Sequence, residues 1–425
     1  MKKSYSRVRG TSDFGPSDSA RIQTLCARAR RVFFLYGYEE IMLPVLEDAG
    51  VFVRGVGQET DIVAKQMFRV SRQNDGEHSD VVLRPEGTAQ VIRFYLEHGF
   101  HKKGPYHKFF YIGPMFRGER PQKGRLRQFT HIGAEMIGAV TPWADAEMIQ
   151  LAWTQLEILG IGEKELKVNS LGCAEDKQRF AERVREILSR QQADLCPDCR
   201  RRAERNPLRV LDCKQSDCRR VVKESVLRER VLCPKCESHF AHVLGVLDRL
   251  GIPYTQDPFL VRGLDYYTHT VFEIESPRLG AQSALGAGGR YHTLVEALGG
   301  RRCPAAGFAL GVERLLLALE PAHEPPAARG VYVAAAQDSL RSEAFYLLGS
   351  LREAGIPAEM DYAHRSLKAQ LRQAQKSNYR VAVILGEDES RQGVVNVKDM
   401  KSSVQKTVRK EEVRALCTEL TRAEN

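Results

Sequence analysis

The amino-acid sequence predicts an α+β fold that is divided into at least two domains. Predicted strands and helices both occur up to about residue 325, and a helical stretch at about 163–242 interrupts the strand patterns. Strands and helices alternate after residue 326, which is typical of a small α/β domain. A chain of 425 residues is long enough for two or three domains, each with its own core.

The first 50 residues contain a predicted helix and a strand-like segment. Apolar residues recur at helical spacing over residues 17–36, and Gly37 is placed to end the helix. Residues 40–46 follow as an apolar segment that contains Pro44. Because proline has no N–H to donate to a neighbouring strand, we expect this strand at a sheet edge or an interface.

Residues 108–138 form two predicted strands around a charged loop. The strands read KFFYIGPMFR and QFTHIGAEMIG. Alternation along the second strand places four residues on one face, namely Phe129, His131, Gly133 and Glu135. The loop gathers its charged side chains within eleven residues: Arg117, Glu119, Arg120, Lys123, Arg125 and Arg127. Arginines held by strands can bind phosphate oxygens in a bidentate manner, although a solvated charged hairpin has the same composition.

The remainder of the first region alternates between helical and strand-like patterns. An apolar helix is predicted at 144–159. Residues 163–242 are helical, rich in arginine and contain most of the cysteines, so we interpret them as an inserted module. Strand patterns return in FLVRGLDYYTHTVFEI and ALGAGGRY, and AAGFALGVERLLLALE predicts a strand followed by a helix.

A proline-rich segment separates this region from the C-terminal part. PAHEPPAARG, residues 321–330, has three prolines and no periodicity, which favours a linker. VYVAAAQ and VAVILGEDE read as strands, with helices predicted at 339–354 and in SLKAQLRQAQK. Basic residues recur there every four positions, at Lys368, Arg372, Lys376 and Arg380. On one helix they would form a basic flank that either follows phosphates or is an ordinary solvated face.

Three other segments carry candidate binding residues. Arg314 follows a strand within GVERLL, in the first turn of a helix, where anions bind. Arg262 precedes a glycine and two tyrosines in LVRGLDYY, and those tyrosines are either core residues or pocket walls. LRPEGT supplies the carboxylate of Glu86 and the hydroxyl of Thr88 on a turn, which is one way to receive an ammonium group.

Charge and composition bound the function further. The net charge of +10 and the pI of about 9.1 suit a polyanionic partner such as nucleic acid. The basic start MKKSYSRVRG has no apolar stretch behind it, so we expect no secretory signal. We also expect no membrane span, because apolar runs stay far below the about 20 residues that a bilayer needs. The expected location is the cytoplasm.

The ten cysteines are clustered, with six of them between Cys196 and Cys236. Cys196-x-x-Cys199 and Cys233-x-x-Cys236 have the spacing of two zinc knuckles, and Cys213 and Cys218 lie between them. In a large chain without an export signal, clustered cysteines are more often metal ligands or free thiols than disulfides. Zinc and plain buried thiols both remain possible interpretations.

The motifs taken together resemble a known family. In order, LRPEGT, FYIGPMFRGERPQKGRLRQF, LVRGLDYYTHTVFE, AGGRY and AAGFALGVERL are similar to segments of bacterial histidyl-tRNA synthetases. The resemblance runs from RGTSDF to RSLKAQLRQAQK and VAVILGEDE, which is nearly the whole chain. GYEEIMLPVLE, the FRGER segment and the GVERL segment look like motifs 1, 2 and 3 of class II synthetases. LVRGLDYY and AGGRY resemble the two signatures of the histidine enzymes.

The resemblance implies a fold and a reaction. Residues 1–325 would be a class II catalytic domain, an antiparallel sheet flanked by helices, with the insertion at about 163–242. Residues 326–425 would be an anticodon-binding α/β domain, and the protein would dimerise through motif 1. The enzyme would activate L-histidine with ATP, release pyrophosphate, and transfer histidine to the 3′-terminal adenosine of tRNA(His).

The resemblance also implies roles for individual residues. The α-phosphate would meet Arg117 and Arg262, which we expect to be the catalytic residues. The rest of ATP would meet Arg125, Arg314, Glu119 and Phe129, with Phe129 stacked on adenine and magnesium ions bridging the phosphates. The histidine would be surrounded by Glu86, Gly87, Thr88, Arg117, His131, Glu135, Arg262, Tyr266 and Tyr267. Such chemistry needs positioning and charge stabilisation more than a strong base.

Two positions depart from the family pattern. His131 stands where glutamine is usual, and His292-Thr293 stand where Asp-Gly is usual. A neutral imidazole can accept a hydrogen bond from the substrate ammonium, whereas a protonated one cannot. With an ordinary pKa of about 6.5, His131 could make substrate binding depend on pH in the physiological range. Glu135 would raise that pKa and burial would lower it, and the alternative is that His131 turns aside and only packs.

Two other classes of protein compete with the enzyme. A non-catalytic synthetase paralogue, such as a regulatory subunit of ATP phosphoribosyltransferase, would have the same catalytic-domain fold. Such proteins typically lack the C-terminal domain and catalytic arginines, whereas Arg262 and about 95 residues after the linker are present here. A purely structural RNA-binding module would leave the ATP motifs unexplained.

Overall fold

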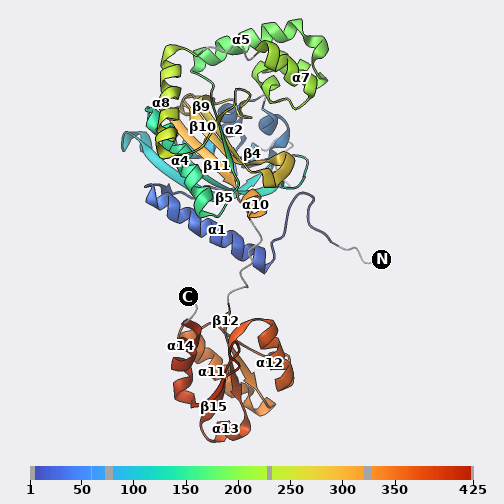
Figure 1. Cartoon of the computed structure of the whole chain (residues 1–425), viewed down its shortest axis with the longest axis vertical. Coiled ribbons are helices and arrows are strands. Elements are labelled where there is room, and N and C mark those ends of the chain that lie inside the picture. Colours follow the sequence, from blue (N-terminus) through green and yellow to red (C-terminus); the bar gives the residue numbers. More distant parts are fainter. Residues whose placement is uncertain (1–4, 59, 72–79, 227–231, 320–327, 423–425) are drawn as a thin grey trace. The chain divides into compact units, whose positions relative to one another are not determined.

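The computed structural model describes residues 5–58, 60–71, 80–226, 232–319 and 328–422. The chain forms two compact units, Met1–Glu320 and Pro321–Asn425, and each has its own hydrophobic core (Figure 1). Most of the linker predicted at 321–330 lies outside the described residues. Among the described residues, no helix is long and apolar enough to cross a membrane.

An eight-stranded sheet forms the centre of the first unit (Figure 1). Its order is β1 (Glu39–Glu40), β5 (His107–Phe116), β6 (Gln128–Ile137), β11 (Ala305–Gly311), β10 (Ala284–Tyr291), β9 (Tyr267–Glu275), β7 (Glu165–Ser170) and β8 (Thr255–Gln256). Neighbours are antiparallel except in the outer pairs β1–β5 and β7–β8. The predicted α+β class and the antiparallel sheet are confirmed.

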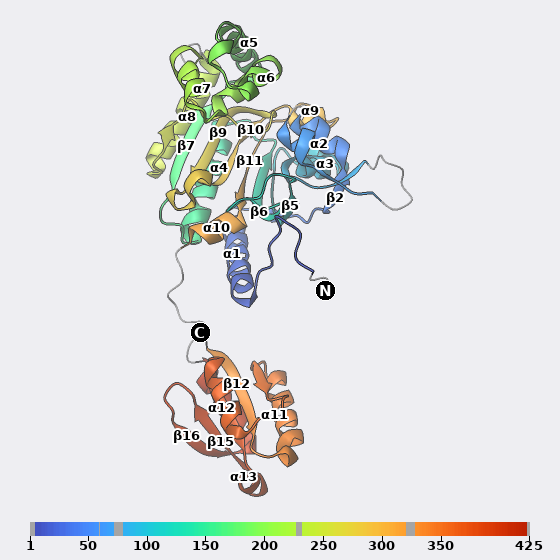
Figure 2. The ribbon, with the colours of Figure 1, turned by 90° about the vertical axis from the view of Figure 1, so that its right-hand side faces the viewer.

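Helices cover both faces of this sheet. On one face lie α1 (Pro16–Leu35), α4 (Pro142–Ile158), α8 (Pro234–Leu250) and α10 (Val312–Ala318), which share a core with alternate residues of the strands. On the other lie α2 (Ala49–Val56), α3 (Thr88–Glu97) and α9 (Leu294–Ala297), which contact one another (Figure 2). A small sheet of β2 (Leu46–Asp48), β4 (Val81–Leu83) and β3 (Phe68–Arg69) precedes α3.

The alternation predicted for β6 is confirmed by its packing. Ile132, Ala134 and Met136 are buried in the core with α1 and α4. The intervening residues face the other side, where Phe129 packs against the core with α2 and α3. This pattern leaves a polar row of β6 available for a site on that face.

The strand predicted over residues 40–46 is broken in the structure. It forms the short β1, an irregular segment and then β2. The carbonyl of Leu43 accepts from Arg84 Nη1 at 2.9 Å, and that of Pro44 accepts from Gln90 Nε2 at 2.8 Å. Side chains thus satisfy the backbone where a proline cannot extend a ladder. The strand predicted from residue 259 similarly begins only at Tyr267.

The helical insertion begins later than predicted. The strand β7 falls inside the predicted range 163–242 but pairs with β9 in the large sheet, so it belongs to the central fold. The insertion itself holds α5 (Ala174–Arg190), α6 (Pro197–Arg205) and α7 (Ser216–Val221), which lie together at one end of the unit (Figure 1). The last predicted part, α8, extends to Leu250 and packs against α4.

The second unit is an α/β domain, as its alternating pattern predicts. Its sheet has the order β13 (Ala358–Met360), β12 (Arg329–Ala335), β14 (Tyr379–Leu385), β15 (Val394–Asp399) and β16 (Gln405–Arg409). The strands β13, β12 and β14 are parallel to one another. The strand β15 is antiparallel to β14, and β16 is antiparallel to β15. The helices are α11 (Arg341–Glu353), α12 (Leu367–Lys376), α13 (Glu387–Arg391) and α14 (Val413–Arg422).

Short 3-10 and π segments complete the described elements. They are η1 (Ile62–Gln66), η2 (Phe100–Lys102), η3 (Gln192–Asp194), η4 (Pro207–Asp212), η5 (Val222–Val226), η7 (Pro277–Gln282), η8 (Asp338–Leu340) and η9 (Lys410–Glu412).

The predicted basic stripe is one residue shorter than expected. Lys368, Arg372 and Lys376 are exposed on α12. Asn378 has a left-handed backbone (φ 56°) that ends the helical run, so Arg380 lies on β14 and pairs with Asp399 instead.

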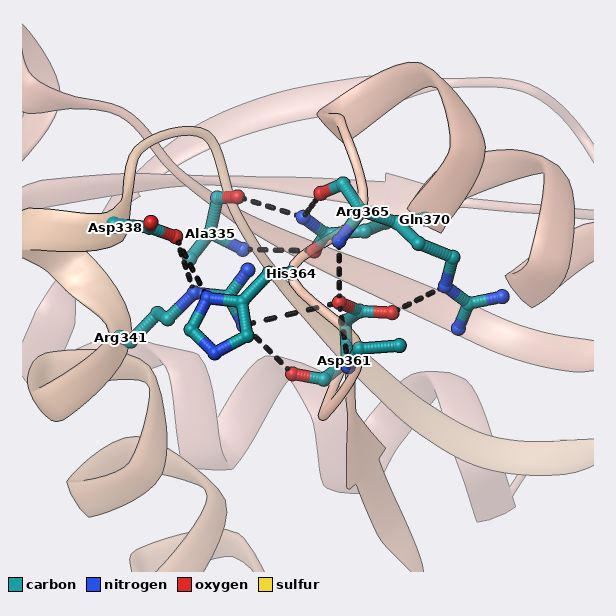
Figure 3. Close-up of polar contacts among 8 residues, drawn as sticks. Ala335, Asp338, Arg341, Asp361, His364, Arg365 and Gln370 are labelled. Atoms are coloured by element: carbon teal, nitrogen blue, oxygen red, sulfur yellow. Dashed lines mark hydrogen bonds and ion pairs between the residues drawn. The ribbon is translucent and has the colours of Figure 1, made fainter.

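A polar cluster fixes the loop that precedes α12 (Figure 3). The buried carboxylate of Asp361 accepts hydrogen bonds from the Arg365 backbone N–H at 2.9 Å and from the Arg365 side chain. Gln370 Nε2 donates to the carbonyls of Ala335 (2.9 Å) and Arg365 (2.7 Å). The loop between β13 and α12 is therefore held against the end of β12, with His364 and Arg365 exposed.

Candidate active site

A cavity of about 550 Å³ opens on the face of the large sheet that bears the polar row of β6. Twelve of the residues selected from the sequence line it: Glu86, Gly87, Thr88, Arg117, Glu119, Arg125, Phe129, His131, Arg262, Tyr266, Tyr267 and Arg314. The thirteenth, Glu135, is buried behind them and contacts Thr88. His292 and Thr293 are not among the lining residues. Segments far apart in the sequence thus converge on one cavity.

Glu86 closes one end of the cavity at the start of α3. Its carboxylate accepts hydrogen bonds from the backbone N–H groups of Thr88 (2.7 Å) and Ala89 (2.8 Å). These N–H groups have no partner inside the helix, so the carboxylate stabilises the first turn. Burial raises the pKa of Glu86, and the two backbone hydrogen bonds oppose that shift.

Glu135 lies at the centre of a buried hydrogen-bond network. Its Oε1 accepts from the Thr88 hydroxyl at 2.6 Å, and its Oε2 accepts from the Tyr291 hydroxyl at 2.5 Å. Burial raises the pKa of Glu135 to about 8, although both hydrogen bonds lower it. Tyr291 belongs to the AGGRY segment, so this contact joins β10 to β6 across β11.

The pKa of Glu135 predicts a pH effect on stability. The unfolded carboxyl has a pKa of about 4.3, so the folded chain retains a proton that the unfolded chain releases. The contribution of Glu135 to the free energy of unfolding should therefore be complete below about pH 4. It should decrease as pH rises to about 8, by up to about 1.4 kcal/mol per pH unit. We expect Glu135→Gln to remove this contribution. The test is the change in the urea unfolding midpoint between about pH 5 and pH 8, measured for both proteins. The same change in wild type and in Glu135→Gln would refute the prediction.

Tyr111 also lines the cavity, although it is not among the residues predicted from the sequence. A Cβ atom at Gly87 or at Gly133 would lie 2.3 Å from Tyr111 Cζ. Both glycines are therefore required for the close approach of this ring. The signal was present, because Tyr111 lies opposite Gly133 in the predicted hairpin, but a tyrosine in an apolar strand reads as core.

Arg117 and Phe129 face each other within the cavity. The Arg117 Nε donates to the carbonyl of Pro85 at 2.9 Å, and its guanidinium lies 5.2 Å from the centre of the Phe129 ring. A cation at this distance from an aromatic face is attracted to it. The contact fixes a positive charge between the LRPEGT turn and the β6 strand.

Two further arginines lie at the charged loop, and Arg314 holds it against α10. Arg314 donates to the carbonyls of Gly124 (2.9 Å) and Ala284 (2.6 Å). Arg125 lies 3.4 Å from the carboxylate of Glu119. Two arginines of the loop between β5 and β6, Arg117 and Arg125, line the cavity, whereas Arg120 is exposed, so the loop is only partly the solvated hairpin of the alternative interpretation.

Arg262 projects from the loop before β9 and pairs with Glu273. The insertion supports this loop. Arg209 Nη2 donates to the carbonyl of Gly263 at 2.7 Å, and Asn206 Nδ2 donates to Asp265 at 2.9 Å. These contacts join residues more than 50 positions apart, and no sequence pattern indicates them.

His131 differs from its sequence-based expectation. Burial and the nearby cations Arg117, Arg314 and Arg84 lower its pKa well below 6.5. This direction favours the neutral imidazole, in contrast to the ordinary pKa from which a pH switch at this residue is expected. Within the described residues, its buried Nδ1 has no hydrogen-bond partner. A buried polar atom without a partner beside a cavity is available to a ligand or to an ordered water.

Comparisons with known proteins agree with this geometry. A family model for histidyl-tRNA synthetase matches residues 10–315, and one for an anticodon binding domain matches residues 330–420. A histidine–tRNA ligase from Moorella thermoacetica is 46% identical over 95% of both chains. One from Syntrophotalea carbinolica is 42% identical over 99% of both. The structure resembles apo S. aureus histidyl-tRNA synthetase, with a TM-score of 0.78 and 31% identity over 98% of this chain and 100% of that one.

Proposed function

Because this chain belongs to the histidyl-tRNA synthetase family, we propose that its central cavity performs both steps of charging tRNA with histidine. The chain is an aminoacyl-tRNA ligase for histidine, and ATP is a substrate of that family. The regulatory-subunit alternative is set aside, because ligases at 42–46% identity match nearly the full length.

The observation that carries the proposal is the convergence of arginines and buried carboxylates on one cavity. In the first step, an oxygen of the histidine carboxylate bonds to the α-phosphorus of ATP, and the bond to the bridging oxygen of pyrophosphate breaks. In the second, a hydroxyl of the terminal adenosine attacks the activated carbonyl and AMP leaves. Both steps develop negative charge on oxygens, which fixed cations stabilise.

The phosphate-binding roles are those that the family resemblance implies. We assign Arg117 and Arg262 to the α-phosphate, and it supports this assignment that both line the cavity. Arg125 and Arg314, held together at the charged loop, would bind the outer phosphates. The ring of Phe129 would stack on adenine beside Glu119, replacing or sharing its contact with Arg117.

The buried polar network suits the amino acid. Glu86 and Thr88, with the backbone at Gly87, would receive the α-ammonium group, and the unpartnered Nδ1 of His131 would accept from it. Glu135, Tyr266 and Tyr267 would surround the imidazole. A site built to satisfy polar side-chain atoms rejects amino acids that leave those groups unpaired.

Magnesium would enter with ATP rather than occupy a protein cage. The carboxylates of Glu119, Glu273 and Glu275 line the cavity, and each already pairs with a cationic side chain: Arg125, Arg262 and Lys167, respectively. Oxygen ligands of this kind fit an ion that keeps most of its bonds to phosphates and water. When bound, the ion would neutralise charge on the leaving pyrophosphate.

We further propose a homodimer through motif 1 and a cytoplasmic location. The motif 1 segment exposes Met42 (88%) and Leu46 (50%), and Leu35 is exposed at the end of α1 (73%). Burying such residues against a second copy would be favourable. Sedimentation analysis would reveal the dimer, and Met42→Glu should shift it toward the monomer.

The second unit would recognise the anticodon of tRNA(His). Lys368, Arg372 and Lys376 form an exposed row on α12 that can follow phosphates. The cluster around Asp361 holds Arg365 exposed just before that helix (Figure 3). Fixed arginines of this kind bind phosphates and base edges.

Replacing His131 with glutamine should leave the pH dependence of histidine binding unchanged. Both side chains present a neutral acceptor, because the pKa of His131 lies well below the physiological range. The KM for histidine is to be compared in the two proteins between about pH 6 and pH 8.5, since the substrate itself titrates near the lower limit. An inflection that disappears in His131→Gln would contradict this prediction.

Charging of a bacterial tRNA pool tests the complete reaction. Labelled histidine should become bound to tRNA in an ATP-dependent manner, and the product should be an alkali-labile ester. Oxidation of the terminal ribose diol with periodate should abolish acceptance. No transfer of histidine, or equal transfer to periodate-treated tRNA, would contradict the proposed function.

A further inference from the structure

Four cysteine sulfurs converge in the insertion. The Sγ atoms of Cys196, Cys199, Cys213 and Cys218 all lie within 4.8 Å of one another. Cys196 precedes α6, Cys199 lies in the first turn of α6, Cys213 follows η4, and Cys218 lies on α7. Three short elements thus each present sulfur to one point.

The spacing of these sulfurs fits a single metal ion. Zinc–sulfur bonds of about 2.3 Å in a tetrahedron place sulfurs about 3.8 Å apart. The Sγ atoms of Cys196 and Cys213 are 4.0 Å apart. A disulfide needs about 2.05 Å and joins sulfurs only in pairs, so it does not account for four that approach one point.

The surroundings are those of a closed site. Cys199 and Cys218 are fully buried, and Cys213 is almost so. The backbone N–H of Cys196 donates to Cys218 Sγ at 3.2 Å. Such N–H donors stabilise thiolates, which are the form that binds metal. The point where the sulfurs meet is therefore largely buried, with Cys196 partly exposed and Cys213 at the wall of the cavity.

The two short helices at the site each contribute little to the hydrophobic core of the insertion. The nine-residue α6 buries Cys199 and Ala203, and the six-residue α7 buries Cys218 and Val221. Each helix thus buries one cysteine and one small or medium apolar residue, and the remainder of α6 is mostly charged. Short polar helices of this kind are typically stabilised by a metal or by cross-links.

We propose that Cys196, Cys199, Cys213 and Cys218 bind one structural Zn²⁺ ion. Four thiolates in a closed tetrahedral site favour zinc among the common divalent ions. The ion would connect α6, η4 and α7 and add to the hydrophobic core that they share with α5.

The grouping differs from the one that sequence spacing suggests. The second pair, Cys233 and Cys236, lies with Cys173 and Asp176 instead of with the first pair. There, the Asp176 carboxylate already pairs with Arg179 and accepts the N–H of Cys233 at 3.1 Å. We assign no ion to that group.

The ion would also support the candidate active site. Cys213, Lys214 and Arg219 line the cavity. Arg209, within η4, holds the carbonyl of Gly263 beside Arg262. Zinc would therefore act as a positioning group for the loop that carries Arg262, without contacting a substrate.

Zinc content in the full-length protein tests the proposal. Protein purified without chelator should contain zinc, and Cys199→Ser and Cys218→Ser should each contain one fewer ion per chain. Cys417→Ala is the matched control, since Cys417 is a fully buried free cysteine in the other unit, and it should retain the wild-type content. Unchanged zinc in both serine variants would overturn the proposal.

X-ray absorption at the zinc edge tests the proposal on wild-type protein, so it does not depend on whether the serine variants fold. The wild-type spectrum should show a zinc shell of sulfurs at about 2.3 Å. Zinc-free wild type with all ten cysteines reactive after unfolding would overturn the proposal, as would a disulfide between any two of the four. Neither measurement depends on histidine activation, so failure here leaves the proposed function intact.

Discussion

Replacing Arg262 with alanine is expected to slow histidine activation by about 10²–10³-fold, because one fixed cation at the developing phosphate charge is lost. The effect should appear mainly in kcat of ATP–pyrophosphate exchange. Folding should change little, because the insertion holds this loop through backbone carbonyls and Asp265, and the ion pair that is lost with Glu273 is partly exposed. A thermal unfolding midpoint close to that of wild type would verify this.

Two further variants sharpen the result. Arg262→Lys retains the charge but not the bidentate geometry, so its rate should lie between those of wild type and Arg262→Ala. Arg278→Ala removes an arginine that pairs with Glu163 outside the cavity, so exchange should stay near the wild-type rate. Exchange by Arg262→Ala within a few-fold of wild type would remove Arg262 from the catalytic residues.

Deleting residues 326–425 is expected to separate the two activities of the enzyme. The first unit has its own cores and contains the whole cavity, so histidine activation should persist. Charging of tRNA should fall by at least about 10²-fold in kcat/KM, because the phosphate contacts of the second unit are lost. The two assays are to be run on the same preparation.

A charge-reversal variant of the full chain provides the control for the deletion. Lys368→Glu, Arg372→Glu and Lys376→Glu change exposed residues of α12 and leave the core of the second unit intact. The variant should also activate histidine normally and charge tRNA poorly, with a weaker salt dependence. An equal loss of both activities would mean that the second unit serves folding of the first.

Local patterns predicted the parts of the fold that depend on local chemistry. The alternation of Phe129, His131 and Glu135 was readable because a strand has a period of two residues and one face is buried. The helix at Pro16–Leu35 followed from apolar spacing and a terminal glycine. Grouping the predicted cavity residues required the family resemblance as well, since they come from four separate segments.

Long-range contacts decided the features that sequence analysis missed. Arg84 and Gln90 bind the carbonyls beside Pro44, which turned a predicted strand into an irregular segment. The strand β7 pairs with β9, which moved the start of the insertion. The pKa of His131 depends on burial and on three arginines from other segments, so its direction could not be fixed from neighbours in sequence. Tertiary context overrides local preference in each case.

Histidine-dependent ATP–pyrophosphate exchange tests the central claim most directly, because it isolates the first step in the cavity from any contribution of tRNA. Purified protein is incubated with ATP, labelled pyrophosphate and each of the twenty amino acids in turn. We expect exchange with histidine and background rates with the other amino acids. In Arg262→Ala, the exchange rate with histidine should be strongly reduced. Background exchange with histidine, or comparable exchange with another amino acid, would contradict the central claim.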